Sequence, residues 1–194
     1  MTVQRDVLFQ VIDALEALEI PYMIVGSFAS NYWGRPRTTH DADLVVEIPA
    51  DKAHDLAQLL SKEFYAPDFV IAEAIQRGDH FNALHEEHPF KIDFWIRKET
   101  AYDREQFMRR QRGTMFERLV WVSSSEDTIL SKLVWFKSAP VLDRQLQDAL
   151  EVLEIQEPDL DQGYLDRWAS VLGVEDLLAD IRARAAGYQD ARAG

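Results

Sequence analysis

Residues 37–46 have the sequence RTTHDADLVV, in which a polar turn leads into an apolar strand. Side chains two positions apart in a strand share a face, so Asp41 and Asp43 point one way and the apolar residues beside them point the other. We therefore expect a strand that buries one face in a core and carries two carboxylates on the other. Such carboxylates repel one another unless a cation lies beside them.

A second strand repeats this arrangement further along the chain. Residues 91–96 read KIDFWI, and Asp93 lies on the face opposite Ile92 and Phe94. If the two strands are neighbours, three carboxylates converge on one surface. Carboxylate oxygens without cysteine ligands favour Mg²⁺ or Mn²⁺, and two such ions can support phosphoryl transfer. The alternative is a set of strand aspartates that simply face solvent.

A third polar feature follows the short apolar run at residues 22–25. Gly26 and Ser27 come next, and residues 28–33 are expected to form a short helix. Backbone N–H groups at the start of a helix attract phosphate, and glycine lets a ligand approach the backbone closely. We expect a phosphate-binding turn here, with an ordinary tight turn as the alternative.

Hydrophobic periodicity gives the organisation of the rest of the chain. It predicts an α/β (α+β) fold, with a mixed sheet and flanking helices in residues 1–100 and a mostly helical region in residues 101–194 packed on it. The predicted strands are 22–25, 41–48, 80–85, 90–96 and 115–122. The predicted helices are 3–18, 50–64, 102–110, 126–137, 141–153, 160–172 and 174–186.

Composition excludes several classes of protein. The 194 residues include 21 basic and 34 acidic side chains, a formal charge of −13, and no cysteine. Such a chain repels polyanions on average, so non-specific DNA binding is not expected. Disulfides and thiolate metal sites are excluded. The sequence starts without the apolar core of a signal peptide and has no apolar run long enough to span a membrane, so we expect a cytoplasmic protein without membrane partners.

The order of these motifs resembles a known family. A strand, Gly26-Ser27, a short helix, the pattern Arg37-x-Thr39-x-Asp41-x-Asp43 and a later strand aspartate are similar to the DNA-polymerase-beta-like nucleotidyltransferase superfamily. The resemblance covers residues 20–97, and it implies that residues 1–100 form the nucleotidyltransferase core. Within the superfamily, the motif resembles the minimal and the abortive-infection toxin-type nucleotidyltransferases.

The resemblance implies transfer of a nucleoside monophosphate from an NTP to a hydroxyl group, with release of pyrophosphate. Asp41 and Asp43 would bind two Mg²⁺ ions, and Asp93 would complete the catalytic one and help to deprotonate the hydroxyl. The acceptor stays open between an RNA end such as that of tRNA, a partner protein and a small hydroxyl compound. A toxin with a cognate antitoxin is one possibility, and a non-catalytic nucleotide-binding or protein-interaction module is the alternative.

The same resemblance assigns nucleotide contacts to a set of turn and helix residues. They are Gly26, Ser27, Arg37, Thr39 and Lys132. For Arg37 and Thr39 the alternative role is to brace the loop by hydrogen bonds to the neighbouring aspartates. For Lys132, in a segment with a weaker resemblance, the alternative is a solvated helix lysine. Arg144 and Asp148 have the spacing of an ordinary helix ion pair.

One stretch runs against the acidic character of the chain. Residues 97–118 hold seven basic and four acidic side chains. This stretch is either a solvated face or a surface that receives an RNA end or a triphosphate.

Overall fold

The computed structural model describes residues 2–139 and 143–193. It divides into two compact units. The first comprises the chain up to Phe28 together with Thr38–Val122, and the second comprises Ala29–Arg37 together with the chain from Ser123 onward. The boundary that the sequence placed near residue 100 thus lies after residue 122, because two further strands belong to the first unit.

One mixed sheet organises the first unit. Within the described residues it has seven strands in the order β3-β4-β5-β2-β1-β7-β6. The strands are β1 (Tyr22–Val25), β2 (Asp41–Val46), β3 (Phe64–Tyr65), β4 (His80–His85), β5 (Lys91–Ile96), β6 (Gln111–Met115) and β7 (Arg118–Val122). β2 pairs in parallel with β5 and antiparallel with β1, so it lies in the interior of the sheet. The expected mixed sheet with flanking helices is confirmed.

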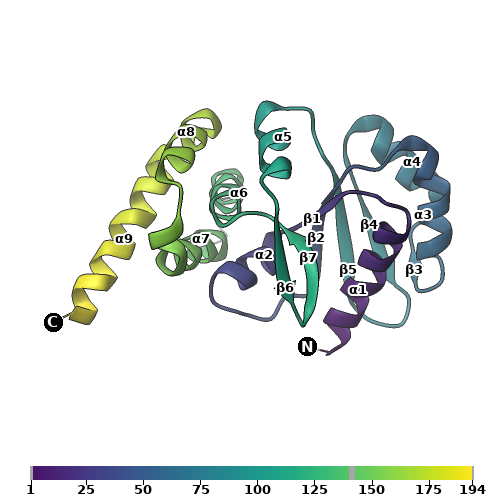
Figure 1. Ribbon diagram of the computed structural model, residues 1–194, viewed down its shortest axis with the longest axis horizontal. Helices are drawn as coiled ribbons and strands as arrows, with labels where there is room; N and C mark the ends of the chain where they lie inside the picture. The colour runs from purple at the N-terminus through teal and green to yellow at the C-terminus, as the bar shows by residue number, and fades with distance from the viewer. Residues whose placement is uncertain (1, 140–142, 194) are drawn as a thin grey trace. The chain divides into compact units, whose positions relative to one another are not determined.

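The first unit also contains four α-helices and one 3₁₀ turn among its described residues. They are α1 (Thr2–Ala17), the 3₁₀ turn η1 (Ala50–Lys52), α3 (Ala53–Leu60), α4 (Asp68–Arg77) and α5 (Ala101–Met108), and α3 and α4 lie beside β3 and β4 in Figure 1. α1 has a fully buried stripe that includes Leu8, Ile12 and Leu15. Such a stripe at three- and four-residue spacing stabilises a helix chiefly through the core it buries.

Alternating burial fixes which face of each strand meets the core. In β2, Ala42, Leu44 and Val46 are at most 1% exposed, while the residues between them are half-buried. In β5, Ile92 and Phe94 are fully buried. The apolar side chains therefore lie on one face of the sheet, and the aspartates of both strands lie on the other.

The second unit is helical among its described residues. It contains most of α2 (Gly26–Trp33), which begins in the first unit, followed by α6 (Ser125–Ser138), α7 (Asp143–Gln156), the 3₁₀ turn η2 (Glu157–Asp159), α8 (Gln162–Leu172) and α9 (Glu175–Ala193). The predicted helix at 141–153 corresponds to α7, although its first two residues lie outside the described residues. No described helix is long and apolar enough to span a lipid bilayer.

Candidate active site

Parallel pairing of β2 with β5 brings the predicted carboxylates together. Asp43 is the direct neighbour of Asp93 across the two strands, and Asp41 is the neighbour of Lys91. Direct neighbours point to the same face, and so do residues two apart in one strand. All three aspartates therefore share one face of the sheet, as the strand pattern predicts.

Gly26 lies directly against this group. Its φ angle is +62°, and a Cβ atom added to it would lie 2.1 Å from Asp43 Oδ2. Only glycine fits here, because a side chain would be strained at this φ and would overlap the carboxylate. Ser27 is half-buried in the first turn of α2. The strand-turn-helix expected at residues 22–33 is thus next to Asp43.

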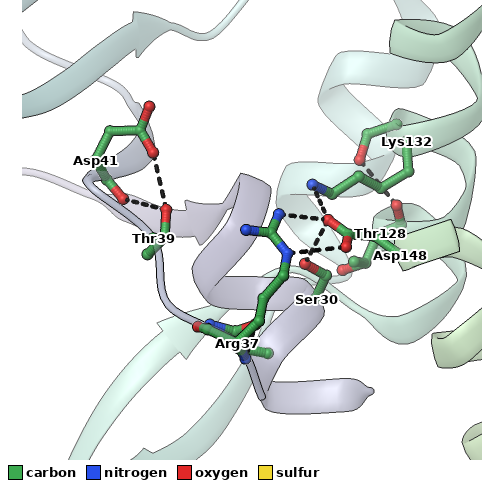
Figure 2. A network of polar contacts seen from close by, with 9 residues as sticks. Ser30, Arg37, Thr39, Asp41, Thr128, Lys132 and Asp148 are labelled. Carbon is green, nitrogen blue, oxygen red and sulfur yellow. Dashed lines mark hydrogen bonds and ion pairs between the residues drawn. The ribbon is translucent and has the colours of Figure 1, made fainter. Parts of the chain in front are cut away.

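Thr39 and Trp95 hold the carboxylates of β2 in place. Thr39 is 6% exposed, and its hydroxyl donates to Asp41 Oδ1 at 2.9 Å (Figure 2). The Trp95 indole N–H donates to Asp43 Oδ1 at 3.3 Å. Thr39 therefore has the bracing role that the sequence left open. Trp95 was not predicted, although its position two residues after Asp93 puts it on the same face.

Asp93 is the most deeply buried of the three carboxylates. It is 8% exposed, and its Oδ2 accepts a hydrogen bond from Lys91 Nζ at 2.6 Å. Its Oδ1 is buried and, among the described residues, has no hydrogen-bond partner. The hydrogen bond to Asp93 raises the pKa of Lys91, burial lowers it, and the charges of Asp93, Asp41 and Asp43 raise it further, so that the net pKa is raised. Lys91 was also missed from the sequence, although strand alternation puts it beside Asp93.

This donor set suits a hard divalent cation. Carboxylate oxygens are the ligands that Mg²⁺ and Mn²⁺ prefer, and the unpaired buried Oδ1 of Asp93 gains a partner if a cation binds there. Across residues 2–139 and 143–193, however, no group of three or more His, Cys, Asp or Glu side chains is arranged as a ready metal site. The chemistry of the residues therefore fits a metal, while Lys91 occupies one oxygen that the metal would need.

Arg37 and Lys132 lie in the second unit, where both bind Asp148. Arg37 donates to the carboxylate through Nε at 3.0 Å and through its terminal Nη2 at 2.8 Å, and Lys132 Nζ donates to Oδ2 at 2.8 Å (Figure 2). The Ser30 hydroxyl also donates to Oδ2, at 3.3 Å. Lys132 and Asp148 are at least 95% buried. Lys132 is therefore not the solvated helix lysine that was the alternative.

The cations determine the ionisation of Asp148. Burial raises the pKa of this carboxyl, but the hydrogen bond from Arg37 and the charge of Lys132 more than reverse that effect, and the net pKa is lowered. The expected helix pair between Asp148 and Arg144 is wrong. The carboxylate points inward from α7 to Arg37 and Lys132, while Arg144 is exposed.

Several basic side chains at residues 97–118 form ion pairs within the first unit. Arg97 pairs with Glu47 and Glu99, and Arg118 pairs with Asp13 and Glu16. A further pair joins Arg104 to Glu99. Arg110 and Arg112 stack against the ring of Trp121. These contacts favour the interpretation of the stretch as a solvated face.

Gly26→Ala should destabilise the protein more than Gly78→Ala. Both glycines have a φ near +60°, but a Cβ at Gly78 meets nothing within 4 Å, whereas at Gly26 it overlaps Asp43. The left-handed backbone alone costs about 1 kcal/mol, and strain at the crowded position should bring the loss to about 2–3 kcal/mol. Urea denaturation measures both free energies of unfolding. Equal losses would show that Gly26 is needed only for its backbone angle.

Asp148→Asn should lower the free energy of unfolding at pH 7 by about 3 kcal/mol, because two cations would lose a buried partner. The pKa of Asp148 is lowered in the folded state, so the stability it contributes is present above the unfolded-state value of about 4 and is lost as pH falls through the lowered value. The difference in the free energy of unfolding between wild type and Asp148→Asn should therefore become smaller as pH falls from about 4 through the lowered pKa of Asp148. Arg144→Gln, on the exposed side of the same helix, is the control and should change stability by no more than about 0.5 kcal/mol.

Comparison with known proteins shows the fold. No protein-family model and no curated protein sequence matches this chain. The solution structure of the antibiotic-resistance factor ANT(2'')-Ia is similar over 98% of this chain and 97% of that one, with 15% identity and a TM-score of 0.55. The same protein in complex with adenylyl-2''-tobramycin is similar over 94% and 98%, with 17% identity and a TM-score of 0.53.

A second antibiotic-modifying protein is also similar. The lincosamide antibiotic adenylyltransferase LnuA, with lincomycin bound, matches 75% of this chain and 95% of that one, with 13% identity and a TM-score of 0.50. The similarity to ANT(2'')-Ia extends over the sheet and the helical second half alike. The chain therefore has the fold of ANT(2'')-Ia over almost its whole length and that of LnuA over three quarters of it.

Proposed function

We propose that this protein is a metal-dependent nucleotidyltransferase that moves a nucleoside monophosphate from an NTP to a hydroxyl group and releases pyrophosphate. The observation that carries the proposal is the pairing of Asp43 with Asp93 on one face of the sheet, with Gly26 against Asp43. The fold shared with known nucleotidyltransferases supports it. The toxin-type assignment rests on the motif alone and stays a prediction.

The three carboxylates have distinct roles in this proposal. Asp41 and Asp43 would hold two Mg²⁺ ions, and Mn²⁺ could replace them. The metal supplies positive charge to the phosphate oxygens when bound. Asp93 completes the site and accepts the proton of the acceptor hydroxyl.

The nucleotide contacts divide according to the two units. Gly26 and Ser27 offer the phosphates backbone N–H groups and a hydroxyl at the start of α2, and Thr39 keeps Asp41 oriented. Contacts of Arg37 and Lys132 with the nucleotide stay predictions from the motif.

Asp43→Asn and Asp93→Asn should each lower the rate of pyrophosphate release with Mg²⁺ and NTP by at least about 100-fold, because each removes a charge that the reaction needs. Asp55→Asn, an exposed change of the same charge on α3, is the control and should keep full activity. If the wild type binds NTP by calorimetry but releases no pyrophosphate with any acceptor, the non-catalytic module is the better description.

We propose a small hydroxyl compound as the acceptor. The net charge of −13 repels an RNA end, and Arg97, Arg104 and Arg118 of the basic stretch at residues 97–118 are paired with acids. ANT(2'')-Ia in complex with adenylyl-2''-tobramycin and LnuA with lincomycin bound show that proteins of this fold bind small molecules of this kind.

Incubation with Mg²⁺ and each NTP in the presence of tobramycin, lincomycin or total tRNA tests the acceptor. We expect mass spectrometry to find a nucleotidyl group on a small compound. A nucleotidyl group on tRNA instead would contradict this choice and favour the toxin interpretation.

A further inference from the structure

We infer that Lys91 is a built-in counter-cation of the carboxylate site, which holds Asp93 while no metal is bound and has to leave it before a divalent cation can bind there. Lys91 is then a positioning residue that sets the metal affinity of the site. This inference rests on the proposed function, since it concerns the same three carboxylates.

The position of Lys91 follows from strand geometry. It lies two residues before Asp93 in β5 and is the direct neighbour of Asp41 on β2, so its side chain shares the face of all three aspartates. Its Nζ is 2.6 Å from Asp93 Oδ2. An ammonium group therefore lies on the face that carries the three carboxylates, in contact with one of them.

The two partners differ in their freedom to move. The Lys91 side chain is 42% exposed, whereas that of Asp93 is 11% exposed. A flexible lysine can turn its head group into water at little cost, while Asp93 is fixed in the sheet. Any exchange of partners at Asp93 must therefore come from a movement of Lys91.

Departure of Lys91 leaves Asp93 in a state that needs a cation. Oδ1 already lacks a partner among the described residues, and Oδ2 would lose its donor. A buried carboxylate without hydrogen bonds or a counter-charge is strongly disfavoured. A divalent cation restores the balance. Its charge would repel an ammonium group on the other oxygen of the same carboxylate, so lysine and metal exclude one another at Asp93.

The arrangement of the acidic residues agrees with this exchange. The described part of the chain contains no ready three-ligand metal group, although three aspartates share one face. On that face the Lys91 ammonium group is already paired with Asp93. The metal must therefore compete with an ion pair that is already formed.

The test is the affinity of the full-length protein for Mn²⁺, measured by electron paramagnetic resonance without nucleotide. Lys91→Gln should bind Mn²⁺ at least about five-fold more tightly than the wild type, a factor typical of coupled binding events. Lys91→Arg keeps the charge and should bind like the wild type. Lys62→Gln removes an exposed lysine elsewhere and controls for the change in net charge.

Stability gives a second measurement, with Lys91→Met as a neutral variant that keeps the apolar stem. In EDTA both neutral variants should melt below the wild type, because the carboxylates repel one another, and Mn²⁺ should raise their melting temperatures more than that of the wild type. Tighter binding by Lys91→Gln or Lys91→Met, but not by Lys91→Arg, supports the inference.

Equal or weaker Mn²⁺ binding by the neutral variants would overturn it, and so would equally tight binding by Lys91→Arg. The proposed function fails separately. If the wild type binds Mn²⁺ and Asp43→Asn abolishes that binding, the proposed metal site is supported, whatever the Lys91 variants show. If none of these proteins binds Mn²⁺, both proposals are overturned.

Discussion

The parallel pairing of β2 with β5 is the constraint on which the rest of the site depends. Because side chains in a strand alternate with a period of two, a slip of one residue would turn Leu44 or Phe94 to solvent and the aspartates into the core. Both apolar side chains are fully buried, so the hydrophobic core fixes the register. That register makes Asp43 the neighbour of Asp93. Apolar burial on the opposite face therefore contributes the free energy that positions the carboxylates.

Repulsion between the carboxylates is then relieved by donors that the same alternation supplies. Thr39 donates to Asp41, Trp95 to Asp43 and Lys91 to Asp93, so a different side chain stabilises each aspartate. Two of these donors are neutral and one is an exposed cation. A neutral donor orients a carboxylate oxygen without cancelling the negative charge of the carboxylate. Asp41 and Asp43 therefore keep their attraction for a metal ion. The positive charge of Lys91, by contrast, opposes metal binding directly.

The sequence predicts the elements around the site better than the contacts that complete it. β1, β2, β4 and β5 lie within two residues of the predicted strands, because alternation and Gly or Pro boundaries define them. α4 was missed because its apolar stripe is thin, with only Ile71 and Ala74 buried. The β6–β7 hairpin was expected as one strand, since its turn places Phe116 and Glu117 at positive φ without the usual Asn-Gly signal. The pairing of Arg37 with Asp148 joins residues 111 positions apart, and no local pattern predicts such a contact.

The motif Arg37-x-Thr39-x-Asp41-x-Asp43 is consequently a structural device as well as a chemical one. Its arginine belongs to the second unit and holds a buried carboxylate there, whereas its threonine and aspartates belong to the first unit and build the sheet face. Over these seven residues the chain passes from the second unit to the first, and each side chain named in the motif has a structural role in the unit to which it belongs. Replacing the arginine should therefore affect stability through Asp148 before it affects any ligand, because the partner of that guanidinium is buried and has a lowered pKa. An effect of such a change on activity would not by itself place Arg37 at the nucleotide, since loss of this ion pair disturbs the unit from which the motif emerges.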